Sequence, residues 1–491
     1  MNRPATRSTA SSTAVAYRIP ALLLVVVFAA ALIALDRAGS SPSPVTRFAS
    51  ARAIDTPTVP PPDAISVAWY CAEGTSTRDG RATETVIIAN LALRPIDATI
   101  TVMHGADKRP VVEKRHIDAL AQERVPIADL IETKEPGVIV EIRGGPAIVE
   151  HELRGRDDIA VGACSREPSR HWYFAEGTTA RGAEEWLTLF NPFGEDAIVD
   201  VSFLTTSGFD APAATQGVPV PRRSRLSIPI HEQVLREDRL AIRVDTRVGR
   251  VVAERSLLFD GTEGTTGLAV SLGATDSASR WRMPVGDAQS GATQTIAIAN
   301  FSQSASTVNV GVVIDGSSAV QSETVNVPGR QVANVDLSDR VTTGAQYSVN
   351  VKVQHGAPVV AEAFTSYVAP APTPGVGTAL GSVTTAKRWA FAAGRVGDVT
   401  DAGDTLLTAV NMSNRPLTVQ LYAYTAGDVN SPKSAPARAV GPGERAVFSL
   451  RDIGIEPDQV LVVAADGPIV AARIILNQGV SISSGIPDLN S

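Results

Sequence analysis

The feature that most constrains how this chain folds is a unit of about 105 residues that occurs four times. Tryptophan recurs at spacings of 103, 109 and 108 residues, and each tryptophan opens a related phrase: WYCAEGTS, WYFAEGTT, WRMPVGDA and WAFAAGRV. The four residues are Trp69, Trp172, Trp281 and Trp389. A unit of this length can bury its own core, unlike the repeats of roughly 20 to 50 residues that build solenoids. The repeat therefore predicts four tandem domains.

Two more landmarks follow each tryptophan in the same order. An apolar run ends in asparagine about twenty residues later, and a glycine turn with another apolar run comes 55 to 58 residues after the asparagine. The asparagines are Asn90, Asn191, Asn300 and Asn411. The later runs read GPAIVEHEL, GRVVAERSL, GAPVVAEAF and GPIVAARII. Landmarks that keep one order and near-constant offsets establish the repeat.

Inside each unit the hydrophobic residues alternate with period two, which is typical of strands that bury one face. Val199, Val201 and Phe203, for example, alternate with Ile198, Asp200 and Ser202. Turn residues recur about every ten positions, so each repeat has room for about seven strands, with short helical turns near 230–236 and 450–453. These features predict an all-β fold of four tandem immunoglobulin-like β-sandwich repeats after one N-terminal transmembrane helix. The alternative is a propeller-type ring in which each repeat supplies two blades.

The N-terminal region predicts export. Residues 19–35 are 17 uncharged, mostly aliphatic residues, preceded by Arg3, Arg7 and Arg18. Such a segment is long enough for a short membrane span, and the arginines place the N-terminus in the cytoplasm. A cleaved signal peptide is the alternative, and it also leads to export. The Pro- and Ser-rich stretch 36–63 reads as an extended linker.

These segments divide the chain at defined boundaries. We expect a cytoplasmic N-terminus at 1–18, a membrane anchor or signal helix at 19–35, a linker at 36–63, and β repeats at 64–168, 169–278, 279–386 and 387–491. The expected location is the cell membrane, with a single span and the bulk of the chain extracytoplasmic.

Charge and motifs narrow the classes of function. The net charge of −7 disfavours a nucleic-acid partner, which needs a cationic face. His151-Glu152 and His231-Glu232 begin like HExxH, but neither has the second histidine of that zinc motif. No nucleophile elbow, Walker loop or dinucleotide fingerprint is present. We therefore predict no catalytic residues, no metal and no cofactor.

The repeated residues have a structural and a functional interpretation. An exposed indole can stack on a sugar ring, but one tryptophan per repeat beside a strand favours a place in the core or between repeats. The asparagines, at the ends of strands, are expected to cap turns. Glu73 and Glu176 are replaced by Val285 and Ala393 in repeats 3 and 4, which favours a structural hydrogen bond over catalysis.

The two cysteines of the chain, Cys71 and Cys164, both lie in repeat 1. Outside the cytoplasm a disulfide is the usual fate of such a pair, and two buried thiols are the alternative. A disulfide would close a loop of about 93 residues, and the chain-entropy treatment gives a stabilisation on the order of 4.5 kcal/mol. It would also place the first and last strands of that repeat side by side.

The phrases WYCAEGTS at 69–76 and WYFAEGTT at 172–179, followed later by VVAERS or PIVAAR, carry a resemblance. They resemble the repeats of an actinobacterial, membrane-anchored family of unknown function. The similarity spans roughly residues 15–490, is specific in repeats 1 and 2, and is degenerate in repeats 3 and 4. The resemblance implies an uncharacterised envelope protein without catalytic residues to carry over, and a link to cell-surface polysaccharide.

Taken together, these patterns predict a non-catalytic cell-envelope protein whose extracytoplasmic repeats act as a scaffold or protein-interaction module. The expected partners are the membrane, through the N-terminal helix, and envelope proteins or cell-surface glycans. A glycan-binding or polysaccharide-assembly accessory protein is the alternative, and a hydrolase with a site between repeats is less favoured.

Overall fold

The computed structural model describes residues 57–490 except 157, 318–319, 339, 395, 397–402 and 428–430. The predicted cytoplasmic N-terminus and membrane anchor, and most of the linker, lie outside the described residues. The described residues form one compact unit. This unit is built from strands, which confirms the all-β prediction.

Repeats 1 and 2 each contain two sheets. In repeat 1 the sheets have the orders β1-β6-β3-β4 and β5-β2-β7-β8. The strands are β1 (Ser66–Cys71), β2 (Thr83–Asn90), β3 (Ile96–Met103), β4 (Val111–Ile117), β5 (Gln122–Pro126), β6 (Gly137–Arg143), β7 (Ala147–Arg154) and β8 (Ile159–Ala163), with η2 at Ile127–Asp129. In repeat 2 the corresponding sheets are β12-β11-β15-β9, with β13 also on β11, and β14-β10-β16-β17. The elements are β9 (His171–Phe174), β10 (Ala183–Asn191), β11 (Ala197–Thr205), β12 (Gly208–Asp210), η3 (Ala213–Thr215), β13 (Val218–Val220), β14 (Ser224–Pro229), α3 (Ile230–Gln233), β15 (Ala241–Val248), β16 (Val252–Asp260) and β17 (Thr266–Leu272).

Repeats 3 and 4 follow the same plan. Repeat 3 has the sheets β18-β23-β20-β21 and β22-β19-β24-β25. Its strands are β18 (Arg280–Asp287), β19 (Ala292–Asn300), β20 (Ser306–Ile314), β21 (Val320–Val327), β22 (Gln331–Asp336), β23 (Gln346–His355), β24 (Val360–Tyr367) and β25 (Gly375–Leu380). In repeat 4 one long strand, β32, takes the place of the sixth and seventh strands and joins both sheets. The elements are β26 (Ala386–Phe391), β27 (Asp404–Asn411), β28 (Leu417–Tyr424), β29 (Lys433–Ser434), β30 (Arg438–Val440), β31 (Arg445–Ser449), α4 (Leu450–Ile453), β32 (Val460–Asn477), β33 (Gly479–Ser484) and β34 (Ile486–Asp488).

The sandwich in each repeat differs from the predicted immunoglobulin-like one in strand number and order. Repeats 1 and 3 have eight strands in two four-stranded sheets, where the sequence suggested about seven. An immunoglobulin sandwich places its first strand with the second and its last with the sixth. Here β1 pairs with β6, and β7 pairs with β2. The end strands have therefore exchanged sheets, and an added eighth strand extends the second sheet. The short helices α3 and α4 lie where helical turns were predicted.

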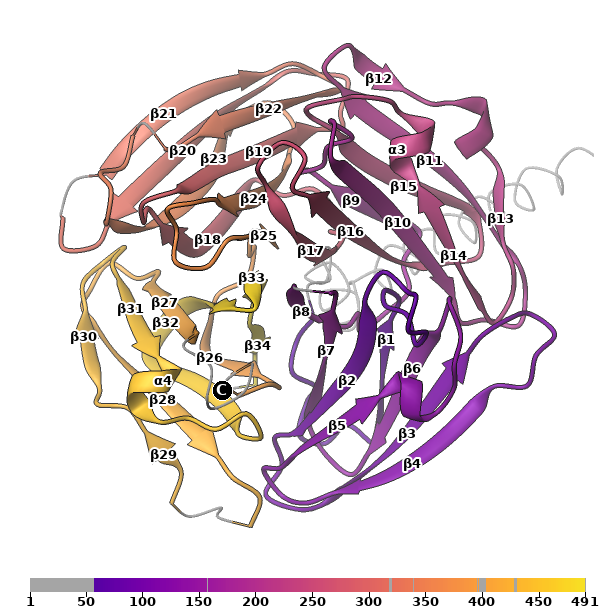
Figure 1. Cartoon of the computed structure of the whole chain (residues 1–491). Coiled ribbons are helices and arrows are strands. Elements are labelled where there is room, and N and C mark those ends of the chain that lie inside the picture. Colours follow the sequence, from indigo (N-terminus) through magenta and orange to yellow (C-terminus); the bar gives the residue numbers. More distant parts are fainter. Residues whose placement is uncertain are drawn as a thin grey trace, which may run out of the picture. The chain divides into compact units, whose positions relative to one another are not determined.

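The four repeats close into a ring (Figure 1). Strands β17, β25 and β33 are equivalent to β8, the eighth strand of repeat 1. We call these four the inner strands. They contact one another in cyclic order, because β8 and β25 each contact both β17 and β33. Around the ring, the sheet with the first strand of one repeat packs on the sheet with the second strand of the next. Tyr173 of β9, for example, packs against Phe301, which follows β19, with ring centroids 5.1 Å apart.

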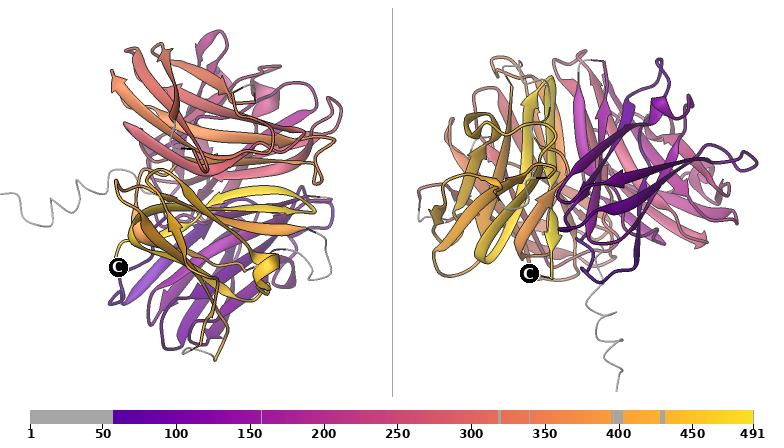
Figure 2. Two further views of the ribbon diagram at one scale, coloured as in Figure 1. Left: turned by 90° about the vertical axis from the view of Figure 1, so that its left-hand side faces the viewer. Right: turned by 90° about the horizontal axis from the view of Figure 1, so that it is seen from below.

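The first and last described segments meet where repeat 4 adjoins repeat 1. The Val59 amide donates a hydrogen bond to the Pro487 carbonyl at 2.9 Å, and the Asn490 side chain donates to the Val59 carbonyl at 3.3 Å. Side views show strands running between the two ends of the ring, with the C-terminus at one of them (Figure 2). Pro57, the first described residue, lies at this same end, which we therefore call the N-terminal end. We call the opposite end the mouth end.

Candidate functional site

The four repeated tryptophans lie in the interiors of their repeats. Each is 0–1% exposed, so none presents an indole face to solvent. Trp172, Trp281 and Trp389 each donate a hydrogen bond from the indole nitrogen to a backbone carbonyl near the start of the seventh strand, at 2.8 to 2.9 Å. Trp69 is equally buried but has no such bond, and the Arg166 guanidinium lies over its ring. These positions give the tryptophans a packing role and no route to sugar stacking.

The four repeated asparagines make one hydrogen-bond pattern. In each repeat the side-chain nitrogen donates to the carbonyl four residues later and to a carbonyl at or just after the end of the fourth strand. The side-chain oxygen accepts from the amide two residues later. All four residues are fully buried. Each asparagine therefore caps the turn between the second and third strands and ties it to the fourth.

Replacing Asn191 with alanine should lower the free energy of unfolding by about 2–3 kcal/mol, because two buried carbonyls and one amide lose their partner. Urea denaturation of the purified protein measures the change. Asn309→Ala is the matched control, because the Asn309 side chain makes one hydrogen bond, of 3.4 Å, with a described residue. Equal destabilisation by both variants would contradict the capping role.

Cys71 and Cys164 are joined by a disulfide, with their Cα atoms 4.7 Å apart. β1 and the segment after β8 thus lie side by side, and Tyr70 and Ser165 exchange backbone hydrogen bonds. His151 lies close enough to both sulfur atoms to share an ion with them, but the sulfurs are bonded to each other.

Reduction of this disulfide is expected to lower the free energy of unfolding by about 4 kcal/mol, since the loop spans 93 residues. Thermal unfolding with and without a phosphine reductant, after partial unfolding to expose the buried bond, measures the loss. The Cys71→Ala/Cys164→Ala variant should show the same lower stability in both conditions. A reductant effect that persists in this variant would show another cause.

The contacts between repeats centre on a glutamate of the seventh strand, and sequence reasoning missed this role. The Glu254 carboxylate of repeat 2 accepts a hydrogen bond from the Glu73 amide of repeat 1 at 2.7 Å. Glu362 of repeat 3 accepts from the amides of Ala175 and Glu176 at 3.1 and 2.7 Å. In each case the donors belong to the Ala-Glu pair of the WY-AEG phrase. One carboxylate therefore anchors the first loop of the preceding repeat.

The same contact closes the ring. Glu150 of repeat 1 accepts hydrogen bonds from the amides of Ala392 and Ala393 of repeat 4, at 3.2 and 3.1 Å. These two alanines occupy the place of the Ala-Glu pair in repeats 1 and 2. The junction of repeat 4 with repeat 1 is thus built like the internal junctions, as a closed ring requires.

A buried cation of the preceding repeat pairs with each of these glutamates. Arg255 lies 3.2 Å from Glu362, and Arg473 lies 3.0 Å from Glu150, with all four side chains at 0% exposure. In the junction of repeats 1 and 2 the cation is a histidine, His151, 3.5 Å from Glu254. Burial favours the neutral imidazole, but Glu254 and Glu84 outweigh it and raise the pKa of His151 to about 9. Three of the four junctions therefore hold a buried ion pair.

The junction of repeats 3 and 4 lacks both members of this pair. Ala363 stands at the cation position and Ala472 at the glutamate position. The loop that would donate amides carries Pro284, which has no N–H. The Pro284 carbonyl instead accepts hydrogen bonds from Thr408 at 2.6 Å and from Arg445 at 3.2 Å. The three positions have changed together, so no buried charge is left without a partner.

The junction of repeats 2 and 3 holds more buried carboxylates than cations. Glu176, Glu185 and Glu362 gather around Arg255. Burial raises the pKa of Glu185 to about 8; Arg255 opposes the rise and Glu176 adds to it. Burial likewise raises the pKa of Glu176 to about 8.

Glu73 is in the opposite situation. Burial would raise its pKa, but Arg225 and Arg81, with a hydrogen bond from Thr188, lower the pKa below its usual value. Arg225 comes from repeat 2 and donates to the carbonyls of Ala72 and Gly74. The glutamates of the AEG phrases thus take part in junctions between repeats, in line with the structural role expected for them.

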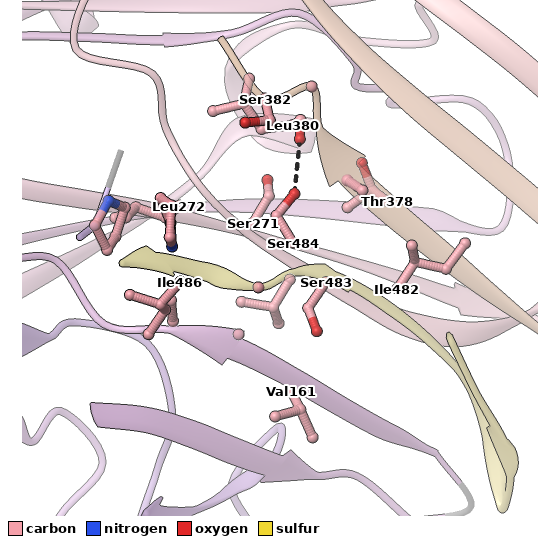
Figure 3. Close-up of a pocket in the computed structure, with 18 of the residues that line it drawn as sticks. Val161, Ser271, Leu272, Thr378, Leu380, Ser382, Ile482, Ser483, Ser484 and Ile486 are labelled. Carbon is pink, nitrogen blue, oxygen red and sulfur yellow. Dashed lines mark hydrogen bonds between the residues drawn. The ribbon is translucent and has the colours of Figure 1, made fainter. Parts of the chain in front are cut away.

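A small axial cavity of about 90 Å³ lies among the inner strands at the N-terminal end. Figure 3 shows Val161, Ser271, Thr378 and Ser483, each from a different repeat, around this space. The space could hold about three waters. The hydroxyls of Ser271 and Thr378 accept hydrogen bonds from Arg255 at 2.8 and 3.3 Å, and that of Ser483 accepts from Arg473 at 3.2 Å. The other two hydroxyls of the lining, those of Ser382 and Ser484, donate to backbone carbonyls. The polar side chains of this cavity therefore already have partners, which makes it a poor candidate for a ligand site.

A wider cavity of about 1020 Å³, which we call the mouth cavity, lies at the other end of the inner strands. The turns that lead into the inner strands of all four repeats line it, together with two segments of repeats 1 and 2. The lining residues fall within 78–83, 154–158, 182–184, 258–268, 372–374 and 477–479. Repeats 1 and 2 supply all of its charged side chains, and repeats 3 and 4 supply Pro, Thr, Asn and Gln. No residue singled out from the sequence lines this cavity.

The acidic groups of the mouth cavity already have partners. Asp79 lies 3.4 Å from Lys134, Glu184 accepts from the Trp186 indole at 3.1 Å, and Asp260 accepts from the Thr262 amide at 2.8 Å. Asp158 is also engaged. Each of these acids therefore already has a partner within the chain.

Two of the four arginines are occupied as well. Arg154 donates to Gln478 of repeat 4 at 2.8 Å and to Glu152 at 2.9 Å. Arg81 lies 4.0 Å above the Trp186 ring and 3.5 Å from Glu73. The other two, Arg78 and Arg156, are exposed and form no ion pair or hydrogen bond with any described residue.

Comparison with known proteins adds a family of unknown function. Residues 151–363 match the sequence model of the family of unknown function DUF5719. The matched stretch begins and ends at equivalent positions, His151 and Ala363, and so spans two repeat lengths. No curated protein matches the chain. Within the described residues, no helix combines the length and apolar character that a membrane span needs.

Among solved structures, one similar chain is described as "Crystal structure of tetra-tandem repeat in extending region of large adhesion protein". The two sequences are 10% identical, the match covers 86% of this chain and 99% of the other, and the TM-score is 0.10. At that TM-score the likeness supports no statement about fold or function. The finding that stands is a match over 151–363 to a family of unknown function.

Proposed function

We propose that this chain is a non-catalytic scaffold of the cell envelope that binds a partner protein at the mouth cavity. The observation that carries the proposal is the arrangement of the four repeats. Their conspicuous shared residues serve cores, turns and junctions, while the less similar turns before the inner strands converge on one wide cavity. A rigid ring that gathers variable loops at one end is a common way to build a binding surface.

The position of Pro57, the first described residue, supports a tethered scaffold. Pro57 lies at the N-terminal end, whereas the mouth cavity lies at the opposite end of the inner strands. If residues 19–35 anchor the chain in the membrane with the linker following, the ring is held by its N-terminal end. The mouth cavity then lies at the end of the ring opposite the attachment of the linker, where an extracytoplasmic partner can reach it.

Site-specific photo-crosslinking in intact cells tests this function. A benzoylphenylalanine at Thr373, which lines the mouth cavity, should form an adduct of defined mass with one partner protein. The same group at Val112, which is 54% exposed on the edge strand β4, is the control. Adducts of equal yield at both positions, or none at Thr373, would count against the proposal.

Glycan binding is the second function that the sequence suggested, but the structure weakens the observation behind it. It rested on four recurrent tryptophans, and all four are at most 1% exposed. Trp172→Ala or Trp281→Ala should therefore unfold a repeat, an effect visible in thermal unfolding, and should not act by removing a sugar-stacking surface. The fifth tryptophan, Trp186, is partly exposed near the mouth cavity, but Arg81 covers its ring.

A further inference from the structure

We infer that the mouth cavity binds an acidic, partly apolar peptide segment of its partner, held by Arg78 and Arg156. This inference rests on the proposed function and specifies the chemistry of the partner. Guanidinium groups bind carboxylates with two parallel hydrogen bonds, and these contacts are short, charge-assisted and directional. Arg78 and Arg156 are the two charged groups of the described lining that have no such contact with any described residue.

The hydrogen-bonding state of the lining, more than its net charge, sets the preference for an acid. The described lining holds four arginines and four carboxylates, so the formal charges cancel. The carboxylates, however, are each engaged by a neighbouring group, and the unused groups are both donors. A ligand with carboxylates supplies hydrogen-bond acceptors to Arg78 and Arg156. A cationic ligand would instead have to break the contacts that the lining carboxylates already make.

The remaining surface of the cavity favours a peptide over a polysaccharide. Leu258, Phe259, Pro372 and Pro374 contribute apolar area, and Phe259 is tilted against Phe364 with ring centroids 5.8 Å apart. No described lining residue is a tryptophan or tyrosine. Aliphatic and proline side chains match the apolar side chains of a peptide, whereas sugar rings are usually held by a flat, open aromatic face.

Fluorescence anisotropy with the purified full-length chain tests the inference. The probe is a labelled decapeptide of alternating Glu and Leu, compared with peptides of alternating Gln and Leu and of alternating Lys and Leu. We expect saturable binding of the Glu-Leu peptide and at least tenfold weaker binding of the other two. Because the lining charges cancel, binding should depend only modestly on salt, unlike binding driven by long-range attraction.

The variant Arg78→Glu/Arg156→Glu should weaken Glu-Leu binding at least tenfold. Its matched control is Lys108→Glu/Arg109→Glu, which makes the same charge change at exposed positions of the β3–β4 connection, outside the cavity lining. Unchanged thermal unfolding of both variants shows that they fold. Equal losses in both variants, or equal binding of the Glu and Gln peptides, would overturn the inference.

A uronic-acid polymer provides the competing ligand. If polygalacturonate displaces the Glu-Leu peptide at a lower concentration of carboxylate than the peptide itself, the site selects an acidic glycan and the peptide assignment is wrong. The two experiments distinguish a failure of the acidic-peptide inference from a failure of the proposed scaffold function. A crosslinked partner at Thr373 without Glu-Leu binding leaves the scaffold intact and removes only the acidic-segment assignment.

Discussion

Replacing Glu185 with glutamine should raise the free energy of unfolding at pH 8 by about 4 kcal/mol and flatten its dependence on pH. Glu185 is fully buried with two other glutamates and one arginine, and its pKa is raised to about 8. Folding at pH 8 therefore has to keep a proton on this carboxyl, or bury its charge, whereas the unfolded chain ionises freely. Glutamine removes that cost, and repeat 3 already carries Gln294 at the equivalent position.

The direction of the pH effect follows from proton linkage. A carboxyl with a raised pKa binds more protons in the folded than in the unfolded state between about pH 4.5 and 8. Its contribution to stability is complete below pH 4.5 and is lost as the pH rises through 8. Glu176, also raised to about 8, acts in the same sense. The wild-type chain should therefore lose stability over this range, and Glu185→Gln should lose less.

Urea denaturation at pH 5, 6.5 and 8 provides the measurement. Glu232→Gln, at an exposed position in α3, is the matched control and should follow the wild-type profile. If the profiles of Glu185→Gln and the wild type run parallel, Glu185 is not protonated in the folded chain.

Replacing Arg473 with alanine should destabilise the ring by about 3–5 kcal/mol. Arg473 is fully buried and binds Glu150 at 3.0 Å, the Ala393 carbonyl at 3.3 Å and the Ser483 hydroxyl at 3.2 Å. Its removal leaves the Glu150 carboxylate buried without its cation, and the cost of that state dominates. The junction that closes the ring would be the first to loosen.

The double variant Arg473→Ala/Glu150→Ala should be less destabilised than the sum of the single variants by at least about 2 kcal/mol. The reason is that it removes both charges, as in the junction of repeats 3 and 4, where Ala363 and Ala472 stand at these positions. Arg415→Ala supplies the control, because the Arg415–Asp466 pair is about half exposed and should contribute less than about 1 kcal/mol. Additive single effects would show that the two buried groups act independently.

The repeat, its strands and the interior place of the tryptophans could be predicted because they depend on local sequence. Alternation with period two marks a strand wherever it occurs, and a tryptophan at the same place in four units points to a shared core. The asparagines followed the same logic, since an Asx side chain at a strand end bonds its own turn. All of these features involve contacts within one repeat.

The closed ring and its junctions could not be derived in the same way, since they depend on which repeats meet. The sequence nonetheless contained evidence of contacts between repeats. The seventh strand reads VEH, AER, AEA and AAR in the four repeats, so its glutamate is absent only from repeat 4. The cation after it is absent only from repeat 3, and proline replaces an amide donor in the same repeat. Three coordinated changes at one junction indicate contact between neighbouring repeats.

Strand order was missed for a related reason. Period-two patterns locate strands but carry no information on their partners, so the exchange of the first and seventh strands was invisible. The mouth cavity was missed because its residues differ among repeats, and a search for shared positions passes over them. Arg156, for instance, lies in a connection that has no common motif, and Arg78 follows the AEGT phrase at a position where only repeat 2 has another arginine, Arg181.

The meeting of the two chain ends has a consequence for how the sequence encodes the ring. Val59 and Asn490 are within hydrogen-bond distance, and the junction beside them repeats the contacts of the internal ones. The gene could therefore be circularly permuted, with a short peptide fusing 490 to 57 and new termini placed between repeats 3 and 4. If such a permuted chain folds, the contacts between neighbouring repeats specify the ring, and the order in which the chain visits the repeats does not.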